Sequence, residues 1–437
     1  TTDINGLTTE VKYDKFGKEY LRYEVRSDGT TGAWTRTDSD WCNGDCPESG
    51  KFYTRTRVSG GGESIAYYDS LGRVIRSAKV AFDGRWIYVD SDYDNLGRNK
   101  HQSLPYFSDE SPVGSVSNDY DSVGRLTRVV VPGDSGVAAI TSSSYVATAS
   151  GIETTLVNPA GNQRKEVRNV LGQLIQVTDQ LNGTLNYEYS PAGELYKVVT
   201  DAPDADAVTI RMCYDSLGRK VGMHDPDKGG FKGGSLEPCA TVQNWRSVTG
   251  NAVAGWWHYK YNAFGELIEQ RDPKGQRSVM TYDKLGRMVT RKDYLPSSVL
   301  EANTAWFFDA PLGGTATATT QGKLTAVVMN KSTAAIANSE SSCTGANYCQ
   351  KFNYNARSQV DGTTTHLPDG QEFFTETKYD TIGRAYQQND VLDDFGGVLG
   401  FDSGAQTHFN EYGYAYRTVD LAPWDQTDGV LSEVEEM

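Results

Sequence analysis

The stretch Tyr68-Asp69-Ser70-Leu71-Gly72-Arg73 decides the fold, because its pattern recurs along the whole chain. Regularly spaced copies begin about 21 to 27 residues apart, a period typical of stacked supersecondary units. The chain is therefore a repeat protein. The full Tyr-Asp-x-x-Gly-Arg string begins again at Tyr93, Tyr120, Tyr214, Tyr282 and Tyr379; looser copies span 13–17, 168–172, 189–193, 261–265, 354–358 and 409–413, and a longer one spans 308–313.

Each copy predicts the turn of a β-hairpin. Aromatic and β-branched runs flank the motif at 64–68 and 74–80, and such runs favour strands. An aspartate at the first turn position accepts a backbone N–H, and a glycine three residues later takes the left-handed conformation that closes the hairpin with a bulge. We expect a different turn where Ser358 replaces this glycine. We expect positive φ at Gly72, Gly97, Gly124, Gly218, Gly286 and Gly383.

The motif tyrosine occupies the same place in every hairpin. We expect neighbouring tyrosines to stack on one face of the sheet, where an aromatic pair adds about 0.5–1.5 kcal/mol beyond its burial. The motif arginine is expected to pair with an aspartate or with a carbonyl of the next repeat. These roles are structural and not catalytic. The tyrosines of the full copies are Tyr68, Tyr93, Tyr120, Tyr214, Tyr282 and Tyr379.

Composition favours one continuous all-β architecture over residues 1–437, with an acidic, poorly ordered tail at 420–437. The chain has 45 glycines and 26 tyrosines, and its net charge is -15. That charge argues against nucleic-acid binding, which needs a basic surface. No run approaches the roughly 18 apolar residues of a membrane span. Because strands in a sheet twist, we expect a long curved sheet without helices longer than about three turns.

The six cysteines lie in pairs, and each pair belongs to one of three long intervals between regular repeats. This placement predicts three local disulfides and hence an oxidising compartment, so that the protein is secreted or at the cell surface. Free thiols and a zinc site are the alternatives, but the spacings do not resemble zinc-ligand spacings. The expected pairs are Cys42–Cys46, Cys213–Cys239 and Cys343–Cys349.

No catalytic, cofactor or metal site emerges from the motifs. The string 133–136, Gly-Asp-Ser-Gly, resembles the nucleophile segment of trypsin-like proteases, but the triad also needs a suitable upstream histidine. The acidic string 90–95 lacks the glycine that an EF-hand loop requires at its sixth position. A turn explains the first string and the repeat motif explains the second, so we expect no enzyme, no cofactor and no bound metal.

The recurring motif, together with turns such as Asp272-Pro273-Lys274-Gly275, resembles the YD-repeat or Rhs family. That family includes bacterial Rhs polymorphic toxins, the B and C components of Tc toxins and the repeat shell of teneurins. The resemblance implies antiparallel hairpins coiled into a spiral β-sheet shell around a chamber that holds a polypeptide. The family's C-terminal core with its aspartyl self-cleavage site is not recognisable here, so no catalytic aspartate is assigned.

Two functions follow as hypotheses. The first is a non-enzymatic shell that encapsulates or carries a polypeptide, such as a toxin, with further chain or subunits completing the wall. The second is an extracellular surface or filament protein for adhesion, assembly or glycan binding through exposed tryptophan and tyrosine. An interior loop in the Gly-rich segment 227–234 would favour the shell. Exposed sheet edges that pair with a neighbouring subunit would favour the assembly.

Overall fold

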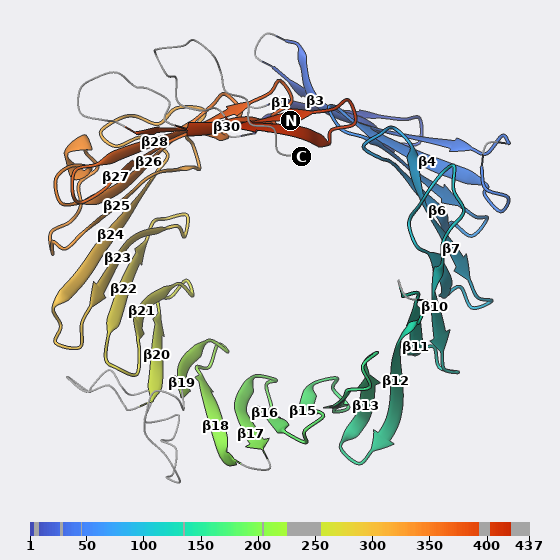
Figure 1. Ribbon diagram of the computed structural model, residues 1–437. Coiled ribbons are helices and arrows are strands. Elements are labelled where there is room, and N and C mark those ends of the chain that lie inside the picture. The colour runs from blue at the N-terminus through green and yellow to red at the C-terminus, as the bar shows by residue number, and fades with distance from the viewer. Residues whose placement is uncertain are drawn as a thin grey trace. The chain divides into compact units, whose positions relative to one another are not determined.

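A computed structural model describes residues 1–3, 8–26, 29–44, 46–133, 136–202, 205–224, 255–392 and 403–420. These residues form 31 β-strands in one antiparallel sheet and a single short 3-10 turn, η3 (Glu340–Ser342) (Figure 1). The described ranges contain no α-helix. The all-β fold class predicted from the repeats is confirmed. Within the same ranges, no helical segment has the length and apolar character needed to cross a bilayer.

The chain forms two compact units. The first comprises Thr1–Val116, Ala305–Asn330 and Ala335–Met437, and the second comprises Ser117–Thr304 and Lys331–Ala334. Strands β10 (Ser115–Tyr120) and β24 (Leu300–Phe308) cross the boundary in sequence. The strands of the first unit are β1 (Thr8–Tyr13), β2 (Glu19–Val25), β3 (Thr31–Trp41), β4 (Phe52–Val58), β5 (Glu63–Tyr68), β6 (Val74–Val80), β7 (Trp86–Tyr93), β8 (Asn99–Ser103), β9 (Tyr106–Phe107), β25 (Leu324–Asn330), β26 (Tyr348–Tyr354), β27 (Val360–His366), β28 (Glu372–Tyr379), β29 (Ala385–Leu392), β30 (Ser403–Phe409) and β31 (Ala415–Asp420).

The second unit has the same hairpin construction. Its strands pair antiparallel in sequence order, as β14 does with β15 and β15 with β16. The strands that it contains are β11 (Leu126–Val131), β12 (Ala139–Thr148), β13 (Gly151–Val157), β14 (Gln163–Arg168), β15 (Leu174–Thr178), β16 (Thr184–Tyr189), β17 (Leu195–Ala202), β18 (Ala205–Tyr214), β19 (Lys220–His224), β20 (Trp256–Tyr261), β21 (Leu267–Arg271), β22 (Arg277–Tyr282) and β23 (Met288–Tyr294).

Two kinds of turn alternate along each unit. We call the turns at the motif YD turns; an example is 69–73, between β5 and β6. We call the turns that lead to the next hairpin return turns; an example is 81–85, between β6 and β7. Because consecutive strands run antiparallel, the YD turns of a unit share one rim of its sheet and the return turns share the other. The pairing register shifts at the motif tyrosine, as between Tyr67 and Tyr68, which is the expected bulge.

The glycines of the full motifs all adopt the left-handed conformation, with φ of 77°, 81°, 91°, 74°, 78° and 88° at Gly72, Gly97, Gly124, Gly218, Gly286 and Gly383. The expectation for Ser358 is wrong, because this serine has φ of 57° and the same turn. Its N–H donates to the Asn355 carbonyl at 2.9 Å, as the glycine does elsewhere. The surrounding strands therefore hold a non-glycine residue in a conformation that costs about 1 kcal/mol or more.

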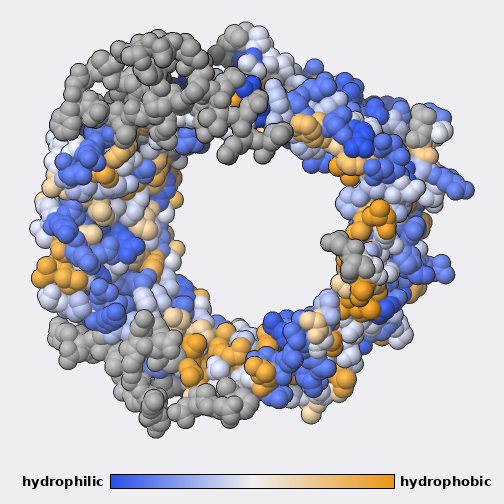
Figure 2. Space-filling view, in the orientation of Figure 1, coloured by the Kyte–Doolittle hydropathy of each residue, from blue (hydrophilic) through white to orange (hydrophobic). Residues whose placement is uncertain are grey.

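Buried apolar residues form only small clusters in the described ranges. Cys213 and Trp256 form one of them. On the face drawn in Figure 2, apolar residues form separate patches among polar ones. The strands thus have two half-covered faces in place of a dry two-layer core. The larger cluster consists of Leu312, Ala326, Val328, Cys343 and Cys349.

Candidate functional site

The YD turn is built around the carboxylate of its aspartate. In the turn 69–73, Asp69 Oδ1 accepts the N–H groups of Leu71 at 2.8 Å and Arg73 at 2.9 Å. Its Oδ2 accepts Arg73 Nε at 2.7 Å, so the carboxylate holds both the turn backbone and the arginine. This geometry repeats in every full copy. The equivalent aspartates are Asp94, Asp121, Asp215, Asp283 and Asp380.

Two degenerate copies, at 169–173 and 355–359, preserve the geometry with a pair of neutral amides. Asn169 Oδ1 accepts the N–H groups of Leu171 and Gln173, both at 3.0 Å. Asn169 Nδ2 then donates to Gln173 Oε1 at 2.8 Å, which replaces the ion pair. A carboxylate facing a guanidinium and an amide facing an amide are therefore two matched solutions for one turn. An asparagine facing an arginine would set two donors against one another, because its Oδ1 already accepts the turn backbone.

The motif tyrosines do not form the expected stack, because successive repeats are linked through arginine. The Arg73 guanidinium lies 4.6 Å from the ring centre of Tyr93, and the Tyr93 hydroxyl donates to the Val74 carbonyl at 2.8 Å. Tyr214, Tyr282 and Tyr379 make the same kind of carbonyl contact at 2.8, 2.8 and 2.7 Å. Tyr68 differs, since its ring stacks on Phe52 at 4.7 Å.

The geometry of the sheet explains this correction. Tyrosines of consecutive motifs lie on alternate strands, with the strand that starts at the motif arginine between them. Neighbouring strands are about 4.8 Å apart, so the two tyrosines are separated by roughly twice that distance. Rings cannot stack over such a gap, whereas the intervening arginine can cover the next ring. A cation over an aromatic face contributes about 0.5–1 kcal/mol at an exposed position.

The rims of the first unit meet in a seam between its first and last hairpins. The YD turns at 380–384 and 410–414 contact the return turns at 58–62 and 81–85. In Figure 1 the red C-terminal hairpins and the blue N-terminal hairpins come together at the top of the view. Asn410 Nδ2 donates to the Phe82 carbonyl at 2.8 Å.

Side chains from both rims close this seam. Tyr414 Oη donates to the Val80 carbonyl at 2.6 Å, and Lys79 Nζ lies 5.4 Å from the Tyr414 ring centre. Arg384 donates to the Gly60 carbonyl. An ion pair of 2.9 Å joins Arg357 to Glu24. Segments more than 300 residues apart thus meet through turns, not through strand pairing.

The motif aspartates predict a loss of stability in acid. The backbone N–H of Arg98, followed by its side chain, holds the pKa of Asp94 below its ordinary value, and the pKa values of Asp69 and Asp283 are also lowered although burial opposes the shift. A depressed folded-state pKa stabilises the fold above the unfolded pKa, about 3.9, and this stabilisation disappears as pH falls through the folded value.

We therefore expect the contribution of these groups to the free energy of unfolding to be constant above about pH 5. The contribution should fall between roughly pH 4 and pH 2. Urea unfolding at stepped pH measures the slope. The matched control is Asp94→Asn with Arg98→Gln, which copies the Asn169–Gln173 turn. Its acid slope should be shallower than that of the native chain; equal slopes would show that this aspartate does not contribute.

The described residues contain two of the three expected disulfides. Sγ–Sγ distances are 1.99 Å for Cys42–Cys46 and 2.02 Å for Cys343–Cys349. Cys213 is buried, and its expected partner Cys239 lies outside the described residues. Cys343 and Cys349 belong to the cluster with Leu312, whereas Cys42 and Cys46 are only half-buried.

Removing the two disulfides should therefore have unequal effects. Closing loops this short contributes about 2 kcal/mol in each case, but Cys343→Ala with Cys349→Ala also leaves space in a packed cluster, adding about 1 kcal/mol or more. We expect a loss of about 3 kcal/mol for that pair and about 2 kcal/mol for Cys42→Ala with Cys46→Ala. Urea unfolding of both variants compares them, and a larger loss for the Cys42 pair would contradict the argument.

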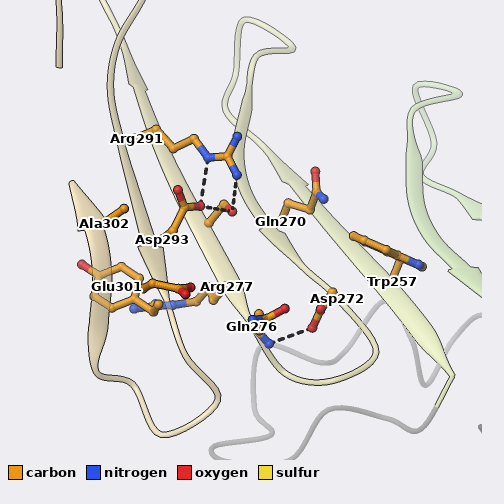
Figure 3. Close-up of a pocket in the computed structure, with 11 residues that line it drawn as sticks. Trp257, Gln270, Asp272, Gln276, Arg277, Arg291, Asp293, Glu301 and Ala302 are labelled. Atoms are coloured by element: carbon orange, nitrogen blue, oxygen red, sulfur yellow. Dashed lines mark hydrogen bonds and ion pairs between the residues drawn. The ribbon is translucent and has the colours of Figure 1, made fainter. Parts of the chain in front are cut away.

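A depression of about 490 Å³ in the second unit is lined by residues of β20 to β24 (Figure 3). Its polar groups are engaged with one another, since Asp293 accepts Arg291 Nε at 2.9 Å and Ser278 Oγ at 2.5 Å. The guanidinium of Arg277 lies 4.5 Å from the ring centre of Tyr294. One ring face that a sugar would stack on is therefore occupied, which weakens the case for glycan binding at this place.

Two titratable groups elsewhere have strongly shifted pKa values. Burial, with a smaller contribution from Arg271, lowers the pKa of His258 to about 4, so its imidazole is neutral at pH 7. Burial and the hydrogen bond to Asp90 raise the pKa of Tyr106 to about 12. No group of three or more metal-ligating side chains occurs in the described ranges. The protease-like string cannot be placed, since residues 134 and 135 lie outside those ranges.

Comparison with known proteins agrees with the turn geometry. The family profile described as RHS Repeat matches residues 261–294, which run from β20 to β23 and contain two YD turns. Turns of the same construction occur in both units. Residues 261–294 thus match an RHS repeat, and the chain resembles the Rhs/YD-repeat family.

Two curated relatives match parts of this Rhs-repeat chain. The double-stranded DNA deaminase toxin A of Burkholderia cenocepacia is 26% identical over 201 residues, which are 44% of the chain and 12% of the relative. The toxin protein Tse5 of Pseudomonas aeruginosa is 25% identical over 276 residues, which are 54% of the chain and 20% of the relative. The chain thus spans a fifth or less of the length of each relative.

Among solved structures, a chain of the Photorhabdus luminescens Tc holotoxin pore aligns with 97% of this chain and 25% of its own length, at 11% identity and a TM-score of 0.37. A chain of the TcdB2–TccC3 complex aligns with 97% of this chain and 32% of its own, at 12% identity and a TM-score of 0.27. The resemblance to the family rests on the repeat profile and on the chain's own turns.

Proposed function

We propose that the chain forms part of the wall of an Rhs-type shell that encloses or carries a polypeptide, and that it performs no catalysis itself. The observation that carries this proposal is the seam of the first unit. There the YD rim of the last hairpins rests on the return rim of the first hairpins, with Tyr414 bonded to Val80 and Asn410 to Phe82. A sheet whose rims close on one another is suited to be a wall.

The surface chemistry supports the same role. Most strand residues on either face of the sheet are half-buried. The sheet therefore needs no second layer, and both of its faces can contact water. The aspartate and the arginine of each full motif pair with one another inside the turn, as in the ion pair Asp283–Arg287 at 2.7 Å. This use of the charged groups within the turns fits a scaffold.

Both curated relatives are named as toxins, and the chain aligns with only a small part of each. We therefore propose the carrier role for this chain and not the activity in either name. We also propose that residues 1–437 act as one continuous repeat region, since YD turns occur in both units. The disulfides support a secreted or cell-surface location.

Protection of an attached polypeptide tests the wall. A disordered, protease-sensitive segment is fused after Met437, and its cleavage is timed against the same segment free in solution. We expect slower cleavage in the fusion. A fusion carrying Gly413→Ala, which is designed to open the seam, should lose the protection. Cleavage of the native fusion as fast as the free segment, together with a solid particle in electron micrographs, would overturn the proposal.

A further inference from the structure

The residue three positions after the first residue of each motif copy forms the tip of the YD turn. In most copies this residue has a large apolar side chain. Tips in the first part of the chain and in the second unit are exposed to water by 73% to 90% of their area. Single exposed apolar residues are ordinary on proteins, but a row at one repeated position marks an interaction surface. The exposed tips are Phe16, Leu71, Leu96, Val123, Leu171, Leu217, Phe264 and Leu285.

The tips of the last three YD turns are different, because the chain itself covers them. Arg357, Ile382 and Tyr412 are half-buried in the seam. Ile382 packs so closely on Gly60 that a Cβ on this glycine would lie 1.9 Å from Ile382 Cδ1. Tyr412 packs likewise on Gly84, where a Cβ would lie 2.6 Å from the tyrosine oxygen. The partner of a YD tip is thus a glycine-containing return turn.

Return turns of the same construction are uncovered elsewhere. In the covered turn, Gly84 N–H donates to the Ala81 carbonyl at 3.1 Å. Gly161 and Gly370 close their turns in the same way, with bonds of 2.9 Å to Asn158 and Leu367. A Cβ on either glycine would meet nothing within 4 Å. The chain therefore carries both halves of the seam in an unoccupied form, exposed tips on one rim and open return turns on the other.

We propose that the exposed YD rim is a docking surface whose partner is the return rim of a second copy of this chain. The contact is heterologous, since one rim meets the other, so that it propagates from copy to copy. It goes beyond the carrier role and holds whether or not a polypeptide is enclosed. The net charge of -15 opposes the approach of two copies, so association should strengthen when salt screens that repulsion.

Sedimentation velocity tests association over a wide range of concentration, at low and at moderate salt. We expect growth with concentration and with salt. Leu71→Lys with Leu96→Lys should reduce it at unchanged circular dichroism, because both side chains are exposed and their loss leaves the fold intact. Val146→Lys is the matched control, since Val146 is 55% exposed but lies within strand β12, outside the turns of both rims. A chain that remains monomeric throughout, or equal weakening by the control, would overturn the proposal.

Photocrosslinking then identifies the contact. A benzophenone amino acid replaces Leu96 in one copy, and an isotopically labelled second copy distinguishes crosslinks between chains from those within one. We expect crosslinks to the return turns at 158–162 and 367–371 of the labelled copy, and few from position 146. Crosslinks confined to the YD turns of the second copy would indicate a tip-to-tip contact and would contradict the assignment. The protection experiment above does not depend on this result.

Discussion

Replacing Gly413 by alanine is expected to separate the seam of the first unit, whereas Gly72→Ala should cost only the strain of its turn. Both glycines close a YD turn with nearly equal φ, 82° at Gly413 and 77° at Gly72. Both donate their N–H to the first residue of the turn, at 3.0 and 3.1 Å. A left-handed alanine costs about 1 kcal/mol in either place.

The two positions differ in what surrounds the new methyl group. At Gly72 a Cβ meets nothing within 4 Å, but at Gly413 it would lie 2.5 Å from the Gly60 oxygen and 2.8 Å from the Gly61 Cα. These are backbone atoms, so the hairpins must move apart. Separation breaks the bonds from Tyr414 to Val80 and from Asn410 to Phe82, each contributing about 1 kcal/mol.

We therefore expect Gly72→Ala to lower the free energy of unfolding by about 1 kcal/mol and Gly413→Ala by about 3 kcal/mol. Hydrogen exchange locates the difference: amides of the return turns 58–62 and 81–85 should exchange faster in Gly413→Ala and remain unchanged in Gly72→Ala. Equal losses of stability with unchanged exchange at these turns would show that the rims are held by other contacts.

The turn chemistry was predictable because it is local. Aspartate, glycine and arginine act within five residues, so Asp69 to Arg73 contain both the donors and the acceptors of the turn. The all-β class and the alternation of turns follow from the repetition of this unit. The pairings Cys42–Cys46 and Cys343–Cys349 were accessible for the same reason, since each pair is close in sequence.

Interactions between distant segments left no such signal. Nothing in the string Gly60-Gly61-Gly62 indicates that Ile382 packs on it, because a glycine that accommodates a neighbour resembles one that serves a turn. The tyrosine stack failed for a related reason: equal positions in the repeat were treated as neighbours in space, although one strand separates them. The left-handed Ser358 shows the opposite case, in which tertiary structure overrides the local preference.

The second large effect is expected at the aspartate of the YD turn. Asp69→Ala removes the acceptor of two backbone N–H groups and of the Arg73 guanidinium. The aspartate is only 6% exposed, so water replaces these bonds poorly. A buried donor that loses its partner costs about 1–3 kcal/mol, and a charged donor costs more. We expect Asp69→Ala to lower the free energy of unfolding by about 3 kcal/mol, as measured by urea unfolding.

A double-mutant cycle separates the carboxylate's charge from its place in the turn. Asp69→Asn keeps the oxygen that holds the backbone, but its NH₂ group then faces Arg73 Nε, so two donors oppose one another. Adding Arg73→Gln restores the complement seen at Asn169 and Gln173, where the amides bond at 2.8 Å. The double variant still loses the contact between Arg73 and the Tyr93 ring, worth about 0.5–1 kcal/mol.

We therefore expect the double variant to be more stable than Asp69→Asn alone, with a coupling of about 1 kcal/mol between the two positions. The control is the mirror experiment at the neutral turn. There Gln173→Arg should destabilise alone, because the guanidinium faces the donor Asn169 Nδ2, and the stability should recover when Asn169→Asp is added. Simple additivity in both cycles would mean that the backbone bonds alone hold the turn. Coupling in both cycles would show that the first and fifth residues of the turn act as a matched pair, as in the 262–266 turn, where Asn262 Nδ2 donates to Glu266 Oε2.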